Sequence, residues 1–128
     1  MTIKAARAMV EEANAQIETI GVDEARKLID DDGVLFVDVR ETIEWDKGHL
    51  PGAVHVPRGL LEFLADPSSP MHEPELAADR RLVLYCASGG RSALAARTLG
   101  SMGYTGVCHV AGGINAWREA GHPTTDGT

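Results

Sequence analysis

Short apolar runs separated by helical patterns constrain the fold of this chain more than any other feature. Residues 34–39 and 82–85 are almost continuously apolar, which is typical of strands covered on both faces. Residues 107–110 form a third run of this kind, and residues 53–56 a shorter fourth. Because helical segments separate these runs, the sequence predicts an α/β domain with a parallel sheet and helices on both faces.

The remaining elements are shorter or less regular. Residues 3–15 have the pattern of a helix with a weak apolar stripe, residues 17–20 that of a short strand, and residues 22–30 that of a second helix. The clearest helix follows Cys86, and Gly103 stands where its C-terminal cap belongs. A last short helix is expected over residues 114–120, before Pro123.

Length and charge exclude several classes of protein. The 128 residues fit one domain, and the net charge of −7, from 12 basic and 19 acidic residues, argues against nucleic acid as the main partner. No segment approaches the roughly 20 apolar residues that cross a bilayer, so no membrane partner is expected. The N-terminus lacks a signal-peptide pattern, so we expect a cytoplasmic location, where Cys86 and Cys108 are thiols rather than a disulfide.

The segment after residues 82–85 carries the residues of a reactive site. A buried strand ends at Cys86, small residues follow, and a helix begins near Arg91. Gly89 and Gly90 permit positive φ, so the backbone can curl with its N–H groups inward and form an anion-binding concavity at the helix N-terminus. A cysteine in that field ionises more readily, and Arg91 adds a planar array of donors for oxyanions. This interpretation requires inward-facing amides and a sulfur that is open to solvent and close to Arg91.

Each cysteine has a second interpretation. Cys86 can be a buried residue at the end of a strand, with the glycines only forming a turn, because free cysteines are commonly buried. Cys108 lies in the apolar run 107–110, which favours packing in the core. The alternative for Cys108 is a resolving thiol that forms a disulfide with Cys86.

The chain contains three distinctive motifs. The first is Cys86-Ala87-Ser88-Gly89-Gly90-Arg91-Ser92. The second runs from Val37-Asp38-Val39-Arg40-Glu41 to Gly48-His49-Leu50-Pro51-Gly52-Ala53, and the third is Ala111-Gly112-Gly113-Ile114 with Trp117. Together they resemble the motifs of the rhodanese domain, the family of single-domain sulfurtransferases, and the first is similar to the active-site loop of that family. The resemblance divides the chain into an N-terminal helical extension (1–16), a rhodanese-like domain (17–121) and a C-terminal tail (122–128).

The resemblance implies a three-layer fold with a five-stranded parallel sheet, and a two-step transfer of sulfur. The Cys86 thiolate would attack a small anionic sulfur donor such as thiosulfate and become a persulfide. A thiol, cyanide or a sulfur-carrier protein would then remove the outer sulfur. Catalysis is expected from Cys86 and substrate binding from residues 87–92, without a cofactor or metal.

Two other functions stay open. Phosphatases and arsenate reductases also place a Cys–loop–Arg cradle at a helix N-terminus, but with a longer loop than the four residues 87–90 found here. Rhodanese-like domains also occur as non-catalytic modules that bind a partner or report oxidation state, although such modules commonly lack the cysteine.

Several residues outside the loop are candidates for supporting roles. By resemblance, Asp38 and Arg40 lie beneath the site, where a structural ion pair is the favoured interpretation, and His49 is expected as a hydrogen-bonded turn residue. Arg58 follows the run 53–56, so it can add a positive charge at the mouth of the site or remain a solvated arginine at a helix start. The five histidines have no zinc-site spacing.

Overall fold

The computed structural model describes residues 2–127 and contains one five-stranded sheet. The strands are β1 (Glu18–Ile20), β2 (Val34–Asp38), β3 (Val54–His55), β4 (Arg81–Tyr85) and β5 (Val107–Val110). Their spatial order is β1-β5-β4-β2-β3, and all neighbouring strands are parallel. The predicted five-stranded parallel sheet is therefore confirmed.

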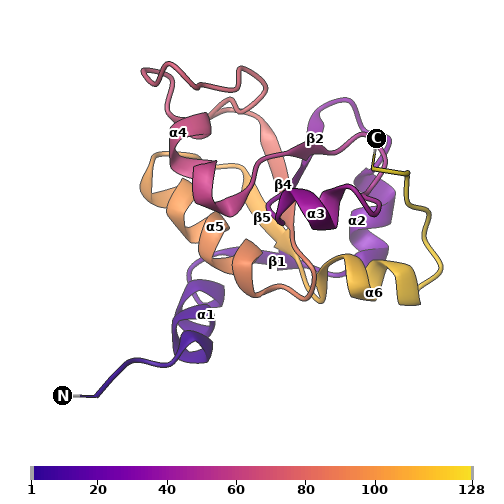
Figure 1. Ribbon diagram of the computed structural model, residues 1–128, viewed down its shortest axis with the longest axis horizontal. Helices are drawn as coiled ribbons and strands as arrows, with labels where there is room; N and C mark the ends of the chain where they lie inside the picture. Colours follow the sequence, from indigo (N-terminus) through magenta and orange to yellow (C-terminus); the bar gives the residue numbers. More distant parts are fainter. Residues whose placement is uncertain (1, 128) are drawn as a thin grey trace.

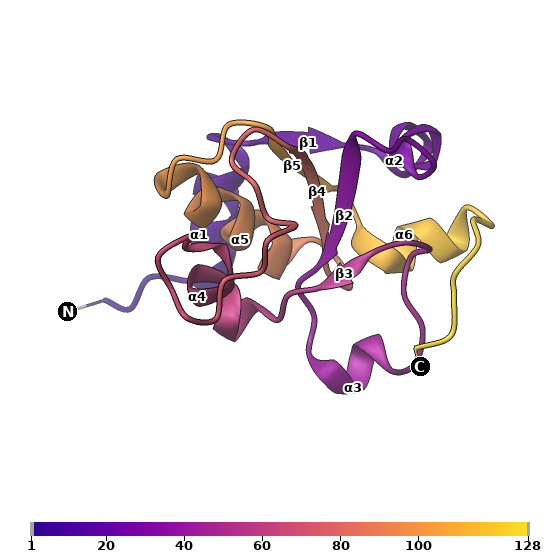
Figure 2. The same cartoon turned by 90° about the horizontal axis from the view of Figure 1, so that it is seen from above.

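Helices cover both faces of this sheet (Figure 1). They are α1 (Ala6–Asn14), α2 (Val22–Leu28), α3 (Thr42–Trp45), the 3-10 helix η1 (Arg58–Leu60), α4 (Leu61–Ala65), α5 (Gly90–Ser101) and α6 (Gly113–Glu119). Helices α4 and α5 lie on one face and α2 and α6 on the other, while α1 packs on α5 (Figure 2). Sequence patterns do not predict α3, η1 or α4, because these elements are too short to show a helical period.

The alternation of side chains along each strand divides the core into two layers. In β4, Leu82 and Leu84 pack toward α4 and α5, whereas Val83 and Tyr85 pack toward α2 and α6. Trp117 is completely buried in the second layer. Because both faces are covered, the strands consist of nearly continuous apolar residues.

The parallel strands deliver their C-terminal ends to one edge of the sheet, where β4, the central strand, runs into the loop that precedes α5. Within residues 2–127 no helix has the length and apolar character needed to cross a bilayer.

Candidate functional site

Cys86 follows the last residue of β4 and precedes a tight turn into α5. Gly89, at the N-cap of α5, has φ +113°, a conformation that residues with a side chain rarely adopt. The turn at Gly89 brings the start of α5 back over the cysteine. The glycine at position 89, which the sequence analysis identified, therefore explains the sharp turn.

The amides of the loop face the cysteine sulfur. The N–H groups of Gly89 and Ser92 donate to Cys86 Sγ, at 3.1 Å and 3.4 Å. The amides of Ser88, Gly90 and Arg91 have no acceptor among residues 2–127. The predicted inward amides are thus observed for Gly89 and Ser92, and both lie at the N-terminus of α5, where the helix dipole favours negative charge.

The expectation of a sulfur open to solvent is wrong for this conformation. Cys86 is 1% exposed and belongs to the core layer that contains Leu84, Ala95 and Leu99. Strand alternation turns its side chain toward α5, and the loop closes over the sulfur.

Arg91 is engaged in an ion pair with Glu44 of α3. Its Nη1 and Nη2 donate to the two carboxylate oxygens of Glu44, at 2.6 Å and 3.0 Å. These hydrogen bonds lower the pKa of Glu44 to about 2 and raise the pKa of Arg91. The guanidinium beside the loop is therefore already paired with a carboxylate. Glu44 lies inside the second motif, but the sequence did not indicate that it would pair with Arg91.

Asp38 and Arg40 form a buried ion pair next to the loop. Arg40 donates to Asp38 at 2.8 Å through Nη2 and at 3.0 Å through Nε, and it also donates to the carbonyl oxygen of Gly48 at 2.7 Å. The backbone of His49 pairs with Thr125, and the ring of His49 stacks on Trp45 with centroids 3.5 Å apart. These contacts tie the segment after β2 to the turn at 48–49.

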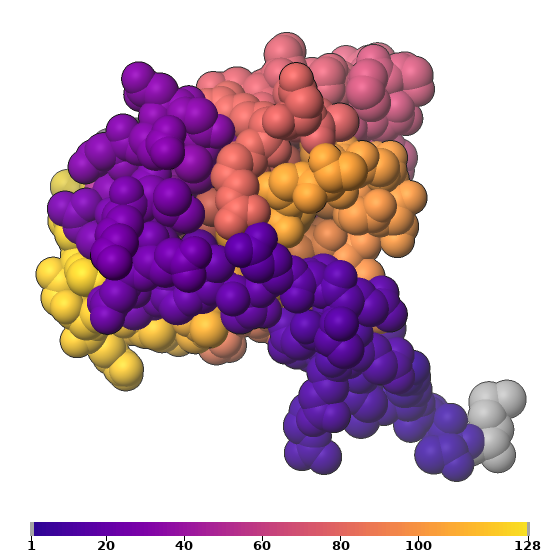
Figure 3. All heavy atoms as spheres, turned by 180° about the vertical axis from the view of Figure 1, so that it is seen from behind, coloured from indigo at the N-terminus to yellow at the C-terminus, as the bar shows by residue number. Residues whose placement is uncertain are grey.

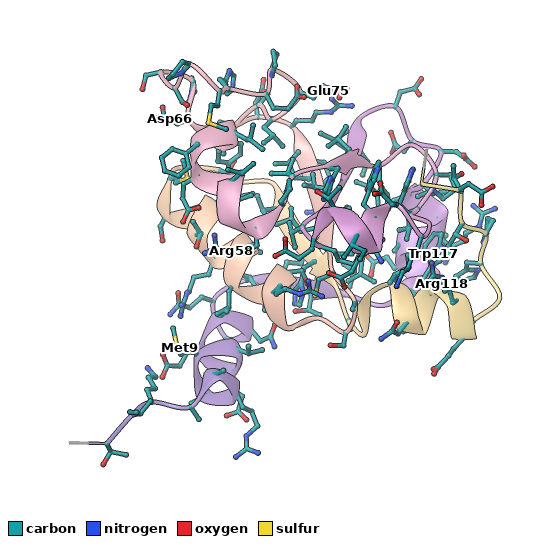
Figure 4. The ribbon with its side chains drawn as sticks, in the orientation of Figure 1. Met9, Arg58, Asp66, Glu75, Trp117 and Arg118 are labelled. Carbon is teal, nitrogen blue, oxygen red and sulfur yellow. The ribbon has the colours of Figure 1, made fainter. Side chains whose placement is uncertain are left out.

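Arg58 lies beside α5 rather than beside the loop (Figure 4). Its guanidinium donates to Glu62 at 3.1 Å and to Thr98 Oγ1 at 3.2 Å. Thr98 stands further along α5 than Ser92, which contacts the cysteine. The structure thus does not bring Arg58 together with Cys86, and its steering role stays a prediction.

Cys108 packs in the core, as expected. It is completely buried on the side of the sheet that faces α2 and α6, and burial raises its pKa to about 11. Cys86 lies in the other layer, and both cysteines are free thiols. A direct disulfide between them is therefore not formed in this structure.

Sequence reasoning missed two polar residues beside the loop. Ser92 Oγ lies 2.9 Å from Nδ1 of His109, and Nε2 of His109 lies 2.8 Å from Oδ1 of Asn14. His109 and Asn14 line a surface cavity of about 220 Å³ together with Ser88 and Gly89. The alternation of side chains within residues 107–110 indicates that His109 and Cys108 point to opposite faces of the sheet, but it does not indicate which face carries α5.

Residues 21–120 match the rhodanese-like domain family, and the chain belongs to that family. It is 36% identical over 99 residues to a protein named sulfurtransferase from Allochromatium vinosum, covering 77% of this chain and 85% of that one. It is 35% identical over 104 residues to a putative sulfur carrier protein from Bacillus subtilis, covering 80% of this chain and 52% of that one. The chain spans about half the length of two of the curated relatives it matches.

The fold is also similar to that of a solved structure from Rhodopseudomonas palustris, described as a protein of unknown function and possible tyrosine phosphatase. The two chains are 43% identical, the TM-score is 0.92, and the similarity covers 98% of each chain. Since α1 begins at Ala6, this similarity includes α1, which precedes the family match.

Proposed function

We propose that this protein is a sulfurtransferase that moves a sulfane sulfur from a donor such as thiosulfate to a thiophilic acceptor through a persulfide on Cys86. The observation that carries the proposal is the pair of amides, from Gly89 and Ser92, that donate to Cys86 Sγ. Amides arranged in this way stabilise the thiolate before the reaction.

The unpartnered amides of the loop support the second part of the proposal. A persulfide adds one sulfur atom beyond Sγ, and that terminal sulfur carries the negative charge. The N–H groups of Ser88, Gly90 and Arg91 supply donors for it without a metal, and the N-terminus of α5 adds its dipole. The covalent intermediate divides one difficult transfer into two easier steps.

Residues 87–92 form the proposed substrate-binding loop, in which Arg91 has a role that depends on Glu44. While the pair is intact, Arg91 holds α3 against the loop. When an anionic donor arrives, the guanidinium can exchange the carboxylate of Glu44 for the donor, since both present oxygen acceptors of similar geometry. The relatives named sulfurtransferase and putative sulfur carrier protein support a sulfur-carrier protein as one acceptor, and a thiol is the other acceptor that we propose.

Phosphatase activity is the second candidate, because the similar R. palustris structure is described as a possible tyrosine phosphatase. A ring of loop amides also suits phosphate. Against this candidate, only four residues separate Cys86 from Arg91, so the ring of donors is small and fits one sulfur atom better than a tetrahedral phosphate. A binding or sensing module is the remaining alternative.

The decisive experiment treats purified protein with thiosulfate and measures its intact mass, then adds cyanide and measures thiocyanate. The proposal predicts a gain of one sulfur atom on Cys86, its loss with cyanide, and neither event in Cys86→Ser. The matched control is Cys108→Ala, which should behave like the unchanged protein. Hydrolysis of an aryl phosphate without sulfur loading would favour the phosphatase, and no reaction with any sulfane donor would favour the module.

A further inference from the structure

A chain of hydrogen bonds leads from Cys86 through the interior to the N-terminal helix. Cys86 Sγ lies 3.6 Å from Ser92 Oγ, which lies 2.9 Å from His109 Nδ1. His109 Nε2 in turn lies 2.8 Å from Asn14 Oδ1. Cys86, Ser92 and His109 are all buried, and the alternation of β5 turns His109 toward α5 while Cys108 points to the opposite face.

The partners of His109 define which nitrogen carries the proton. The Oδ1 atom of Asn14 only accepts, so Nε2 of the neutral imidazole is the N–H donor, and Nδ1 must accept. Among the residues that the structure describes, the hydroxyl of Ser92 is the one group that donates to Nδ1. That hydroxyl also lies 3.3 Å from the carbonyl of Gly89, but the bond to Nδ1 is shorter, and it gives Nδ1 of His109 a donor. Every donor then points the same way, from the Cys86 thiol toward His109.

Within residues 2–127, no charged side chain lines the cavity beside His109. The residues that line the cavity around it are Val10, Asn14, Thr19, Ser88, Gly89, Gly90, Ala111 and Gly112. The groups that face it are Asn14 of α1, Thr19 of β1, Ser92 of α5, and Cys86, which follows β4. Burial lowers the pKa of His109, so the imidazole is neutral at physiological pH and its Nδ1 accepts the hydrogen bond of the Ser92 hydroxyl.

We propose that His109 is a positioning residue for Cys86 that takes up the thiol proton through Ser92, and that Asn14 holds its imidazole in the required tautomer. The Cys86 S–H bond breaks and its proton passes to Ser92 Oγ, while the Ser92 hydroxyl proton passes to Nδ1. The products are a thiolate and an imidazolium whose Nε2–H still donates to Asn14. No oxidant or further reactant is needed, and the same steps in reverse restore the thiol after the sulfur has left. This role rests on the proposed function, in which the thiolate attacks the donor.

The proposal assigns a function to the helix that precedes the family match at residues 21–120. Helix α1 projects from the body of the molecule (Figure 3), yet its inner side packs on α5, where Val10 lies close to Gly90 at the start of that helix. Asn14 is the last residue of α1. The extension thus completes the hydrogen-bond chain that begins at the cysteine.

The test measures how fast iodoacetamide alkylates Cys86 as a function of pH, in a Cys108→Ala background so that one thiol reacts. His109→Gln keeps the size and hydrogen bonds of the side chain but cannot take up the proton, so it should slow alkylation at neutral pH by ~10-fold and move the profile to higher pH. Asn14→Leu should also slow alkylation at neutral pH, by ~3-fold, because leucine cannot hold the imidazole of His109 in the required tautomer. Asn14→Asp should instead speed alkylation at neutral pH, because a carboxylate stabilises the imidazolium of His109.

A matched control and a separate readout make the result decisive. Val107→Ala changes the packing of the same strand and should leave the pH profile unchanged. Coincident profiles for all variants would overturn the proposal, as would a shift of Asn14→Asp in the same direction as Asn14→Leu. If His109→Gln does not fold, the two Asn14 variants decide. Alkylation needs no sulfur donor, so the two proposals can fail separately. A wild-type protein that forms no thiocyanate would refute the proposed function. Shifted alkylation profiles would still support the role of His109.

Discussion

Substituting Gly113 by alanine should both destabilise the domain and displace the cysteine loop. Gly113 begins α6 with φ +57°, and a Cβ atom there would lie 2.6 Å from the carbonyl oxygen of Ala87 and collide with that of Cys86. These two carbonyls accept the amides of Ile114 and Asn115, at 2.9 Å and 3.1 Å, so α6 and the loop must separate to make room.

The magnitude follows from two contributions. Positive φ costs a residue with a side chain about 1 kcal/mol, and a clash with well-packed backbone adds about 2 kcal/mol. We therefore expect a loss of about 3 kcal/mol in the free energy of unfolding, and a fall of ~10-fold or more in sulfur transfer because the amides of the loop move.

Gly121→Ala is the matched control. Gly121 also has positive φ (+82°), but no atom lies within 4 Å of the position of its Cβ, so only the backbone contribution of about 1 kcal/mol applies. Urea unfolding measures both free energies, and the rate of thiocyanate formation measures transfer. Equal losses of stability in the two variants, or full transfer activity in Gly113→Ala, would refute the reasoning.

Three further predictions concern the ionisable groups. Asp38→Asn should lower the free energy of unfolding by about 3–5 kcal/mol, because it leaves the buried Arg40 without its counter-ion, and urea titration would show this. Glu44→Gln should lower the free energy of unfolding by no more than about 1 kcal/mol at neutral pH, because the ion pair with Arg91 is partly exposed. The pKa of Glu44 in the folded protein is lowered from 4.5 to about 2, so its contribution to the free energy of unfolding is present above pH 4.5 and is lost as the pH falls through 2. A difference in unfolding free energy between wild type and Glu44→Gln that persists below pH 2 would contradict this. Cys108, with its pKa raised to about 11, should resist thiol reagents at neutral pH until the protein unfolds, which peptide mass spectrometry can follow.

The sequence alone predicted the sheet because buried parallel strands leave a strong local pattern. The apolar runs at 34–39, 82–85 and 107–110 coincide with β2, β4 and β5. The short elements α3, η1 and α4 were not predicted, since three to five residues are too few to show a period. Their positions depend on what they pack against.

The chemistry of the loop was likewise local. Cysteine, glycines and arginine stand close together in the chain, so the turn at Gly89 and the inward amides could be deduced from residue types alone. The burial of the sulfur could not be deduced in this way, because it depends on which layer of the core receives the side chain of Cys86.

Tertiary structure alone decided which distant residues meet at the loop. Glu44 reaches Arg91 across 47 residues, and Asn14 reaches His109 across 95. Polar pairs so far apart leave no periodic trace in a sequence, because their proximity results from the order of strands in the sheet and from the packing of α1 and α3 beside α5. The residues of the cysteine loop are therefore local in the chain, while Glu44, His109 and Asn14, to which we assign supporting roles, are brought to the loop only by folding.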